Sequence, residues 1–293
     1  MTDKQKSDLE KQHGTTGHSW DGIEELNTPL PRWWLWTLYA CIIWAVGYTV
    51  LYPAWPMVNK ATAGVLGYST RAEVASDIKT VGLANAEITQ RLASTDLTEI
   101  QGDDALNSFA QNAGSAVFRT WCAQCHGSGA AGAKGYPNLL DDDWLWGGDI
   151  ESIHETISVG IRQPEDADGD WLRQSEMPAF GRDELLEDGD IDAVVNYVMS
   201  LSGPVQTPDV VDRGATVYAE NCASCHMDDA TGDRSQGAPN LADAIWLYGG
   251  DYATIRKTVD EARYGQMPAW QDRLTKAQIR AVAAYVHQLG GGE

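Results

Sequence analysis

A long segment occurs twice in this 293-residue chain, and each copy contains the pentapeptide C-x-x-C-H. The first pentapeptide is Cys122–His126 and the second is Cys222–His226. The other matching segments are Gly114–Phe118 with Gly214–Tyr218, Pro137–Leu139 with Pro239–Leu241, Trp144–Asp149 with Trp246–Asp251, Met177–Phe180 with Met267–Trp270, and Ile191–Val198 with Ile279–Val286. The same segments recur in the same order, which indicates a duplicated unit, so we expect two tandem domains with the same architecture.

The C-x-x-C-H pentapeptide predicts covalent attachment of a c-type haem. Its two thiols add to the vinyl groups of the porphyrin, and the histidine that follows ligates the iron. The alternatives are a redox dithiol or one zinc ion shared by the two C-x-x-C pairs, but neither explains the histidine in both copies. The sequence therefore predicts two covalently bound haem c groups. The predicted attachment residues are Cys122, Cys125, Cys222 and Cys225, and the predicted iron ligands are His126 and His226.

Two methionines at matching positions are expected to supply the second axial ligand of each iron. Methionine is a sixth ligand in electron-transfer cytochromes, where it raises the reduction potential. Of the six methionines, only Met177 and Met267 occupy equivalent places in the copies, and both precede a proline. Proline disfavours helix at the preceding residue and so holds each methionine in an extended loop. His154 is the competing ligand for the first iron, but the second copy has Arg256 at its position.

Each ligand histidine needs an acceptor for its other ring nitrogen. A ligating imidazole usually donates this N–H to a carbonyl or carboxylate, and the carbonyl of a rigid proline loop is a suitable partner. Pro137 and Pro239 follow the ligand histidines at short range, and we expect their carbonyls to fill this role. A simple turn would use the same two prolines.

Each copy begins and ends with a helical pattern. Gly114 and Gly214 are expected to let the first helix of each domain approach the last helix closely, since glycine has no Cβ. Phe118 and Tyr218 are expected to pack against Tyr197 and Tyr285 in the core.

The segment Trp33–Tyr52 predicts a membrane anchor. Its 20 residues include no charge, and 17 of them are apolar. Twenty helical residues at about 1.5 Å each span the roughly 30 Å hydrocarbon core of a bilayer. Tryptophans at one end and tyrosines at the other are typical of membrane interfaces. A cleaved signal peptide is the alternative, but such peptides have a short basic leader, whereas the 32 residues before this segment are polar and net acidic.

Negative charge concentrates after the apolar segment. The chain has 21 basic and 42 acidic side chains, of which 4 and 6 lie in residues 1–52, leaving a net charge of −19 on residues 53–293. This balance, with no local basic patch, excludes binding to the phosphate backbone of a nucleic acid. A basic protein is the natural partner of such a surface.

We expect a mainly α-helical chain divided in the following way. The segments are a mostly flexible cytoplasmic tail at 1–32, a transmembrane anchor at 33–56, a periplasmic connecting segment with an amphipathic helix at 57–102, and class I cytochrome c domains at 103–203 and 204–293. The first domain carries an acidic insertion near 162–175, whose residues 165–170 resemble a calcium loop only loosely because the ligand spacing is wrong. No catalytic constellation is found in either copy.

The residues before the anchor carry a family resemblance. His18–Asn27 and Pro29–Trp34 resemble the start of the dihaem subunit III of cbb3-type cytochrome c oxidase. One anchor, a connecting helix and two tandem cytochrome c domains complete that pattern, so the resemblance covers essentially the whole chain.

The resemblance implies the following function, location and ligands. Such a subunit passes electrons from a soluble or membrane cytochrome c to a monohaem subunit, and from there to the catalytic subunit of a haem–copper oxidase. It is anchored in the bacterial inner membrane with a cytoplasmic N-terminus and periplasmic haem domains. By position in the motifs, His126 and Met177 would ligate the first iron, and His226 and Met267 would ligate the second.

Two other functions are compatible with the same motifs. A free-standing membrane cytochrome c shuttle would contain the same anchor and haem domains. A dihaem peroxidase would need an open or displaceable site at one iron, which the two repeated Met-Pro elements make the less favoured hypothesis.

Overall fold

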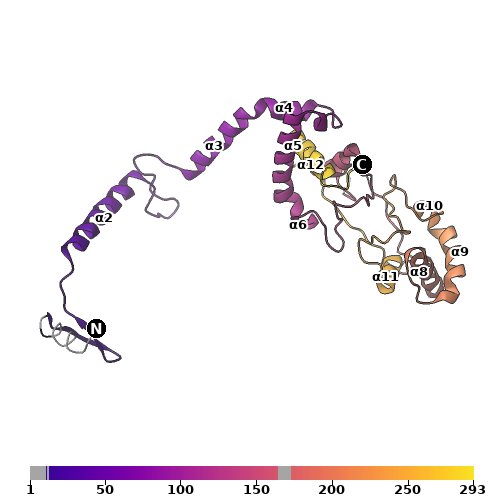
Figure 1. The fold of residues 1–293 in the computed structure, drawn as a ribbon, viewed down its shortest axis with the longest axis horizontal. Helices are drawn as coiled ribbons and strands as arrows, with labels where there is room; N and C mark the ends of the chain where they lie inside the picture. Colours follow the sequence, from indigo (N-terminus) through magenta and orange to yellow (C-terminus); the bar gives the residue numbers. More distant parts are fainter. Residues whose placement is uncertain (1–10, 12, 164–172) are drawn as a thin grey trace. The chain divides into compact units, whose positions relative to one another are not determined.

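The computed structural model describes residue 11, residues 13–163 and residues 173–293. The chain divides into two compact units, residues 1–83 and residues 84–293, whose relative placement is not determined (Figure 1). The second unit contains both C-x-x-C-H pentapeptides.

An antiparallel hairpin lies in the N-terminal tail, in which the sequence predicted a mostly flexible segment. Strand β1, Thr15–Trp20, pairs with β2, Ile23–Leu26. Asp21 and Gly22 connect the strands and have φ angles of 48° and 81°. A two-residue loop with both φ angles positive is the turn that best matches the twist of a hairpin, and Asp-Gly is a preferred sequence for it.

Helix α2, Arg32–Leu51, is the only helix in the described part of the chain that is long and apolar enough to cross a membrane. None of its side chains is buried within the chain. Its last carbonyls, which lack partners inside the helix, accept hydrogen bonds from a loop that folds back on the helix end. Val65 and Leu66 donate their N–H groups to Val50 and Leu51 at 2.9 and 3.1 Å. The helix fits membrane anchoring.

The connecting segment forms two helices where the sequence predicted one. Helix α3, Thr70–Ala84, and helix α4, Ala86–Ser94, are separated at Asn85. The apolar stripe of α3 is exposed, whereas Leu92 of α4 is fully buried. Only α4 packs against the rest of the second unit, so the predicted amphipathic helix is divided at the boundary between the units.

The second unit is helical between long loops. Its elements are η1 (Ile100–Gly102), α5 (Asp104–Val117), the π-helical turn η2 (Phe118–Cys122), α6 (Ala123–His126), α7 (Ile150–Val159), α8 (Asp188–Ser202), η3 (Pro208–Val210), α9 (Val211–Asn221), α10 (Ala223–His226), α11 (Tyr252–Glu261) and α12 (Lys276–His287).

The long helices pair across the two copies. Helix α5 of the first copy packs against α12 of the second, and α9 of the second copy packs against α8 of the first (Figure 1). Gly114 and Gly214 lie at these close contacts, but the last helix that each glycine contacts belongs to the other copy. A Cβ on Gly114 would lie 2.2 Å from the Ala281 carbonyl oxygen, and a Cβ on Gly214 would lie 2.1 Å from that of Ala193.

The aromatic contacts follow the same pairing. The ring centroids of Phe118 and Tyr285 are 5.6 Å apart, and those of Tyr197 and Tyr218 are 5.2 Å apart. Continuous domains at 103–203 and 204–293 would instead pair α5 with α8 and α9 with α12. The structure therefore keeps the predicted helices but exchanges their partners between the copies.

The short connection between the copies explains the exchange. Only residues 203–207 separate α8 from η3, and short connections favour antiparallel packing of the two helices that they join. Asn196, a fully buried residue of α8, fixes this connection. Its Oδ1 accepts hydrogen bonds from the N–H groups of Gln206 and Thr207 at 3.0 and 2.7 Å.

Replacing Gly114 with alanine is expected to lower the free energy of unfolding of the second unit by about 1–3 kcal/mol, because overpacking forces the two helices apart. At a helical glycine without close neighbours, replacement with alanine would instead raise the free energy of unfolding, because alanine favours helix. Gly102→Ala is the matched control, because a Cβ there meets nothing within 4 Å. Guanidinium unfolding of the purified chain measures both, and equal or higher stability of Gly114→Ala would contradict the close contact.

Candidate haem sites

Each C-x-x-C-H pentapeptide lies where a long helix ends and a short helical turn begins. The first pentapeptide begins at the last residue of η2, which continues α5, and ends at the last residue of α6. The second begins directly after α9 and ends at the last residue of α10. Cys122 and Cys222 are half-buried, whereas Cys125 and Cys225 are exposed. All five cysteines of the chain lie in described residues, and none forms a disulfide. Neither pentapeptide therefore loses a thiol to a disulfide.

Both predicted ligand histidines contact the expected proline carbonyls. The Nδ1 atom of His126 lies 3.1 Å from the Pro137 oxygen, and that of His226 lies 3.0 Å from the Pro239 oxygen. A carbonyl oxygen only accepts, so Nδ1 carries the proton in each ring and the Nε2 lone pair is left for a metal. Burial lowers the pKa of both histidines, which the carbonyl contacts partly oppose, so both rings favour the neutral form that binds iron.

The thiol environment does not favour a redox dithiol. Burial, with the nearby second cysteine as the smaller cause, raises the pKa of Cys122 and Cys222 to about 11. An attacking redox thiol needs a lowered pKa instead. A shared zinc site is not formed either, because the described residues include no group of three or more His, Cys, Asp and Glu side chains positioned to hold a metal ion.

Each pentapeptide adjoins an apolar cluster that also contains one of the two predicted methionine ligands. At the first pentapeptide, the cluster includes Phe118, Ile153, Ile157 and Trp270, with Cys122, Trp144 and Met267 packed against it. At the second, the cluster includes Phe180, Tyr218, Ile255 and Val259, with Cys222, Trp246 and Met177 packed against it. The thiols, a neutral imidazole, a thioether and apolar walls are the environment that a haem c group requires.

The methionines lie at the opposite pentapeptides from those implied by motif order. Met267 packs against the same cluster as Cys122, and Met177 packs against the same cluster as Cys222. The pairing predicted from motif order is instead Met177 with His126 and Met267 with His226. The reason is the helix exchange, since each methionine loop leads into the last helix of its own copy.

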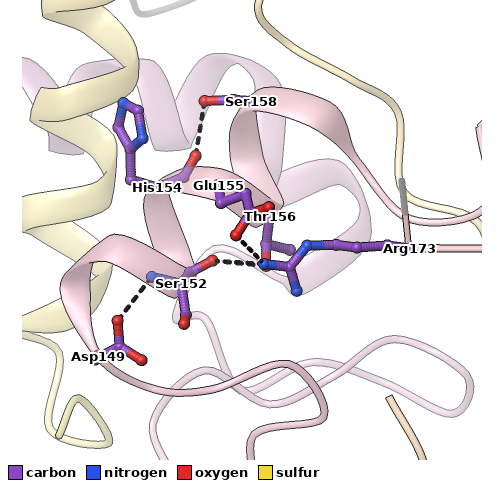
Figure 2. Close-up of polar contacts among 7 residues, drawn as sticks. All are labelled: Asp149, Ser152, His154, Glu155, Thr156, Ser158 and Arg173. Atoms are coloured by element: carbon purple, nitrogen blue, oxygen red, sulfur yellow. Dashed lines mark hydrogen bonds and ion pairs between the residues drawn. The ribbon is translucent and has the colours of Figure 1, made fainter. Parts of the chain in front are cut away.

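His154 faces a different part of the second unit. It lies on α7, where its carbonyl accepts a hydrogen bond from the Ser158 hydroxyl at 2.7 Å (Figure 2). Its side chain lines a cavity of about 500 Å³ together with Leu274 and Arg280, and no residue of either pentapeptide lines that cavity. Burial and the charge of Arg280 lower the His154 pKa. The packing gives no reason to regard His154 as an iron ligand.

Two tryptophans of the repeated segment Trp144–Asp149 make contacts that were not predicted from the sequence. Trp144 donates its Nε1–H to the Gly291 carbonyl, which ties the first copy to the C-terminal end of the chain. A Cβ on Gly237 would lie 2.3 Å from the ring of Trp146, so this ring also contacts the opposite copy. The repetition of these aromatic positions was the signal that could have indicated their role.

The ends of the acidic insertion are held by one arginine. Arg162 donates from Nε to the Ser175 carbonyl and from Nη1 to the Gly265 carbonyl, both at 2.9 Å. Gly265 is two residues before Met267, so this contact again joins the two copies. The calcium-like stretch at 165–170 lies outside the described residues.

Acidic side chains from both copies crowd Asp143. Burial, followed by the charges of Asp243 and Asp141, raises the pKa of Asp143 to about 6. Asp243 belongs to the second copy, so the two acidic loops lie close enough to repel each other. At neutral pH this repulsion opposes folding.

Comparison with known proteins now identifies the family. Residues 12–59 match the family model for the N-terminal domain of cytochrome oxidase-cbb3, FixP; residues 111–202 match cytochrome c; and residues 209–286 match cytochrome c oxidase, cbb3-type, subunit III. The chain is 61% identical to the cbb3-type cytochrome c oxidase subunit CcoP of Cereibacter sphaeroides over 95% of both chains. The chain belongs to the CcoP/FixP family, subunit III of cbb3-type cytochrome c oxidase.

Subunits from other bacteria are similar to this chain over comparable lengths. The subunit CcoP of Rhodobacter capsulatus is 54% identical over 98% of this chain and 99% of its own length. The subunit FixP of Sinorhizobium medicae is 49% identical over the full length of both chains. Membership of this family confirms the mainly α-helical fold with cytochrome c domains and the role as an electron-transfer subunit of a multi-subunit enzyme. The chain is a haem c protein, and the residues at both pentapeptides fit that group.

Replacing His154 with glutamine is expected to leave the haem absorption and electron paramagnetic resonance spectra unchanged, because this side chain lines a cavity away from both pentapeptides. Met177→Ala, which removes a predicted ligand, is the positive control. A new high-spin signal in His154→Gln would show that His154 is an iron ligand.

Replacing Asp143 with asparagine is expected to stabilise the chain at pH 7 by about 1 kcal/mol, after discounting for solvent screening of a half-exposed group. A carboxyl whose pKa is raised on folding loses stability as the pH rises from its unfolded value of 3.8 to its folded value of about 6. The gain in the free energy of unfolding from Asp143→Asn should therefore disappear near pH 4. Urea unfolding at both pH values tests this, and an advantage independent of pH would contradict it.

Proposed function

We propose that this chain is a membrane-anchored subunit with two haem c groups that delivers electrons to a haem–copper terminal oxidase. One observation carries the proposal. In each copy, a C-x-x-C-H histidine donates to a proline carbonyl and adjoins an apolar cluster that contains a methionine. Both sites have the same chemistry, which supports two haem groups of the electron-transfer type.

The residues of the chain would hold the haem groups in the following way. Cys122 and Cys125 would form thioether bonds to one porphyrin, and Cys222 and Cys225 would form them to the other. His126 and His226 would each provide one iron ligand, and Met177 and Met267 would provide the second. Bound haem supplies a one-electron couple at the iron, and histidine–methionine ligation raises its reduction potential.

The proline carbonyls of Pro137 and Pro239 set the orientation of the ligand histidines. A hydrogen bond to Nδ1–H fixes the tautomer and the plane of the ring, and it makes Nε2 a stronger donor to the metal. The apolar clusters beside the pentapeptides would shield the haem groups from water, which also affects the reduction potential. The protein would thus position and tune two electron carriers without catalysing a reaction of its own.

The partners follow from the family and from the charge of the chain. Relatives are named as subunits of cbb3-type cytochrome c oxidase, and we propose that this chain receives electrons from a soluble or membrane cytochrome c donor. It would then pass them to a monohaem subunit and to the catalytic subunit. The net charge of −19 beyond residue 52 supports docking of a basic donor, since opposite charge speeds encounter.

The membrane position rests on α2. We propose that α2 spans the bacterial inner membrane once, with residues 1–32 in the cytoplasm and the haem units in the periplasm. Support comes from the length and composition of the helix and from Arg32, a basic residue at its N-terminal end. Attachment of haem to C-x-x-C-H outside the cytoplasmic membrane favours the same orientation.

A pyridine haemochrome assay on the purified chain is expected to give two haem c groups per polypeptide, because both pentapeptides are complete. Cys122→Ala/Cys125→Ala and Cys222→Ala/Cys225→Ala are the matched variants and should each give one. Fewer than two groups in the unchanged chain would refute the proposal.

Mild detergent extraction followed by sizing tests whether the chain is assembled with an oxidase. Elution with the other oxidase subunits supports the proposed assembly, whereas elution of the chain alone supports a free-standing shuttle.

The rate at which a basic cytochrome c reduces the complex is expected to fall steeply as ionic strength rises, because salt screens the attraction between the surfaces. Stopped-flow mixing over a series of salt concentrations measures this rate. A neutral small-molecule reductant is the control and should show little dependence on salt. A flat profile with the basic cytochrome would refute docking through the acidic surface.

A further inference from the structure

We infer that the two copies exchange iron ligands: Met267 ligates the iron held by His126, and Met177 ligates the iron held by His226. The inference rests on the proposed function, because it takes the two methionines as ligands of two haem irons. It goes further by stating which protein segments complete each site. Each haem pocket would then be built from both halves of the second unit.

The first argument is the composition of the two apolar clusters. Met267 packs on the cluster that adjoins Cys122, together with Trp270 from the same loop. The ring of Trp270 lies 5.8 Å from that of Trp121, the residue before Cys122. Met177 packs on the cluster that adjoins Cys222. Among the described residues, neither cluster places a methionine at the pentapeptide of its own copy.

The backbone fixes the Met267 loop to the first copy. Met267 and Ile161 form an antiparallel bridge with two backbone hydrogen bonds. The N–H of Ile161 donates to the Met267 carbonyl at 2.9 Å, and the N–H of Met267 donates to the Ile161 carbonyl at 3.1 Å. A Cβ on Gly160 would lie 2.3 Å from the Met267 carbonyl oxygen, so the two segments touch. Trp270 also donates its N–H to the Ile157 carbonyl of α7 at 3.1 Å.

The Met177 loop is fixed to the second copy in a corresponding way. The N–H of Phe180 donates to the Val259 carbonyl at 3.0 Å, just at the end of α11. The N–H of Arg182 donates to the Asp260 carbonyl at 2.9 Å. The hydroxyl of Tyr264 donates to the Met177 carbonyl at 3.3 Å. Both methionine loops are therefore held by the helix that precedes the equivalent loop of the other copy.

The exchange follows from the path of the chain. The connection at 203–207, held by Asn196, keeps α8 against α9. Since the Met177 loop leads directly into α8, it must lie on the side of the second pentapeptide. Helix α12 then fills the remaining contact on α5 and brings the Met267 loop to the first pentapeptide. Neither haem site can be completed by one copy alone.

Photo-crosslinking of the whole chain tests the path of the backbone. In a Cys41→Ser background, Gln111→Cys and Arg213→Cys would each be labelled with a benzophenone maleimide after haem attachment. The side chain of Gln111 donates to the Ala284 carbonyl of α12 at 3.0 Å, and that of Arg213 pairs with Asp190 of α8 at 2.7 Å. Peptide mass spectrometry is expected to find capture of α12 by position 111 and of α8 by position 213. Capture of α8 by position 111 and α12 by position 213, or of neither helix, would overturn the exchange.

Spectra of single-haem chains test the ligands themselves. In the Cys122→Ala/Cys125→Ala chain, which keeps only the second attachment site, Met177→Ala is expected to abolish the charge-transfer band of methionine-ligated ferric haem and to permit carbon monoxide binding. Met267→Ala should leave both properties unchanged there. The Cys222→Ala/Cys225→Ala chain should show the reverse dependence. Dependence of either haem on the methionine of its own copy would overturn the inference.

The two tests separate this inference from the proposed function. Crosslinking reports on the path of the backbone and does not depend on electron transfer. A chain with two haem groups, a normal donor reaction and within-copy crosslinks would retain the proposed function and refute the exchange. A chain with fewer than two haem groups and crosslinks between the copies would retain the exchanged fold and refute the proposed function.

Discussion

The close contact of two helix pairs is the constraint on which the rest of the second unit depends. Gly114 and Gly214 allow the backbones of α5 and α9 to approach their partners at distances that no Cβ would permit. Once these pairs form, the start of each pentapeptide is fixed, because each follows directly from the glycine-containing helix. The same pairs determine which methionine loop reaches which pentapeptide, since each loop leads into a partner helix.

The chemistry of the two sites depends on a second, shorter-range contact. A proline carbonyl accepts the Nδ1–H of each ligand histidine and leaves Nε2 for a metal. Burial favours the neutral imidazole, so the fold prepares both rings in the protonation state that ligation requires. The buried thiols have raised pKa values, which distinguishes them from the reactive cysteines of dithiol oxidoreductases.

Charge and packing act at different ranges in this chain. The acidic surface affects how fast a basic partner arrives, and it opposes the close approach of loops such as those of Asp143 and Asp243. The apolar clusters offset this repulsion inside the unit. Arginines placed between the copies contribute as well, because Arg162 joins the ends of the first copy's insertion to the loop that precedes Met267.

Much of the fold and of each site could be predicted from local signals. The uncharged segment at 33–52 predicted α2, the two glycines predicted close helix contacts, and the prolines predicted the acceptors that the histidines contact. The hairpin at Thr15–Leu26 was not predicted, although Asp21-Gly22 is a strong turn signal. The break between α3 and α4 was also missed, because the apolar periodicity continues across Asn85 and does not show which face finds a partner.

The sequence by itself determined the number of C-x-x-C-H motifs, the candidate ligand residues and the family to which the chain belongs. These features depend on residue types at short spacings, which a linear pattern records directly. Only the tertiary structure decided which copy completes which site. The two copies have nearly equivalent helices, so α5 fits α8 or α12 about equally well by pattern. The short connection fixed by Asn196 brings α8 to α9, and α12 is then left to pair with α5.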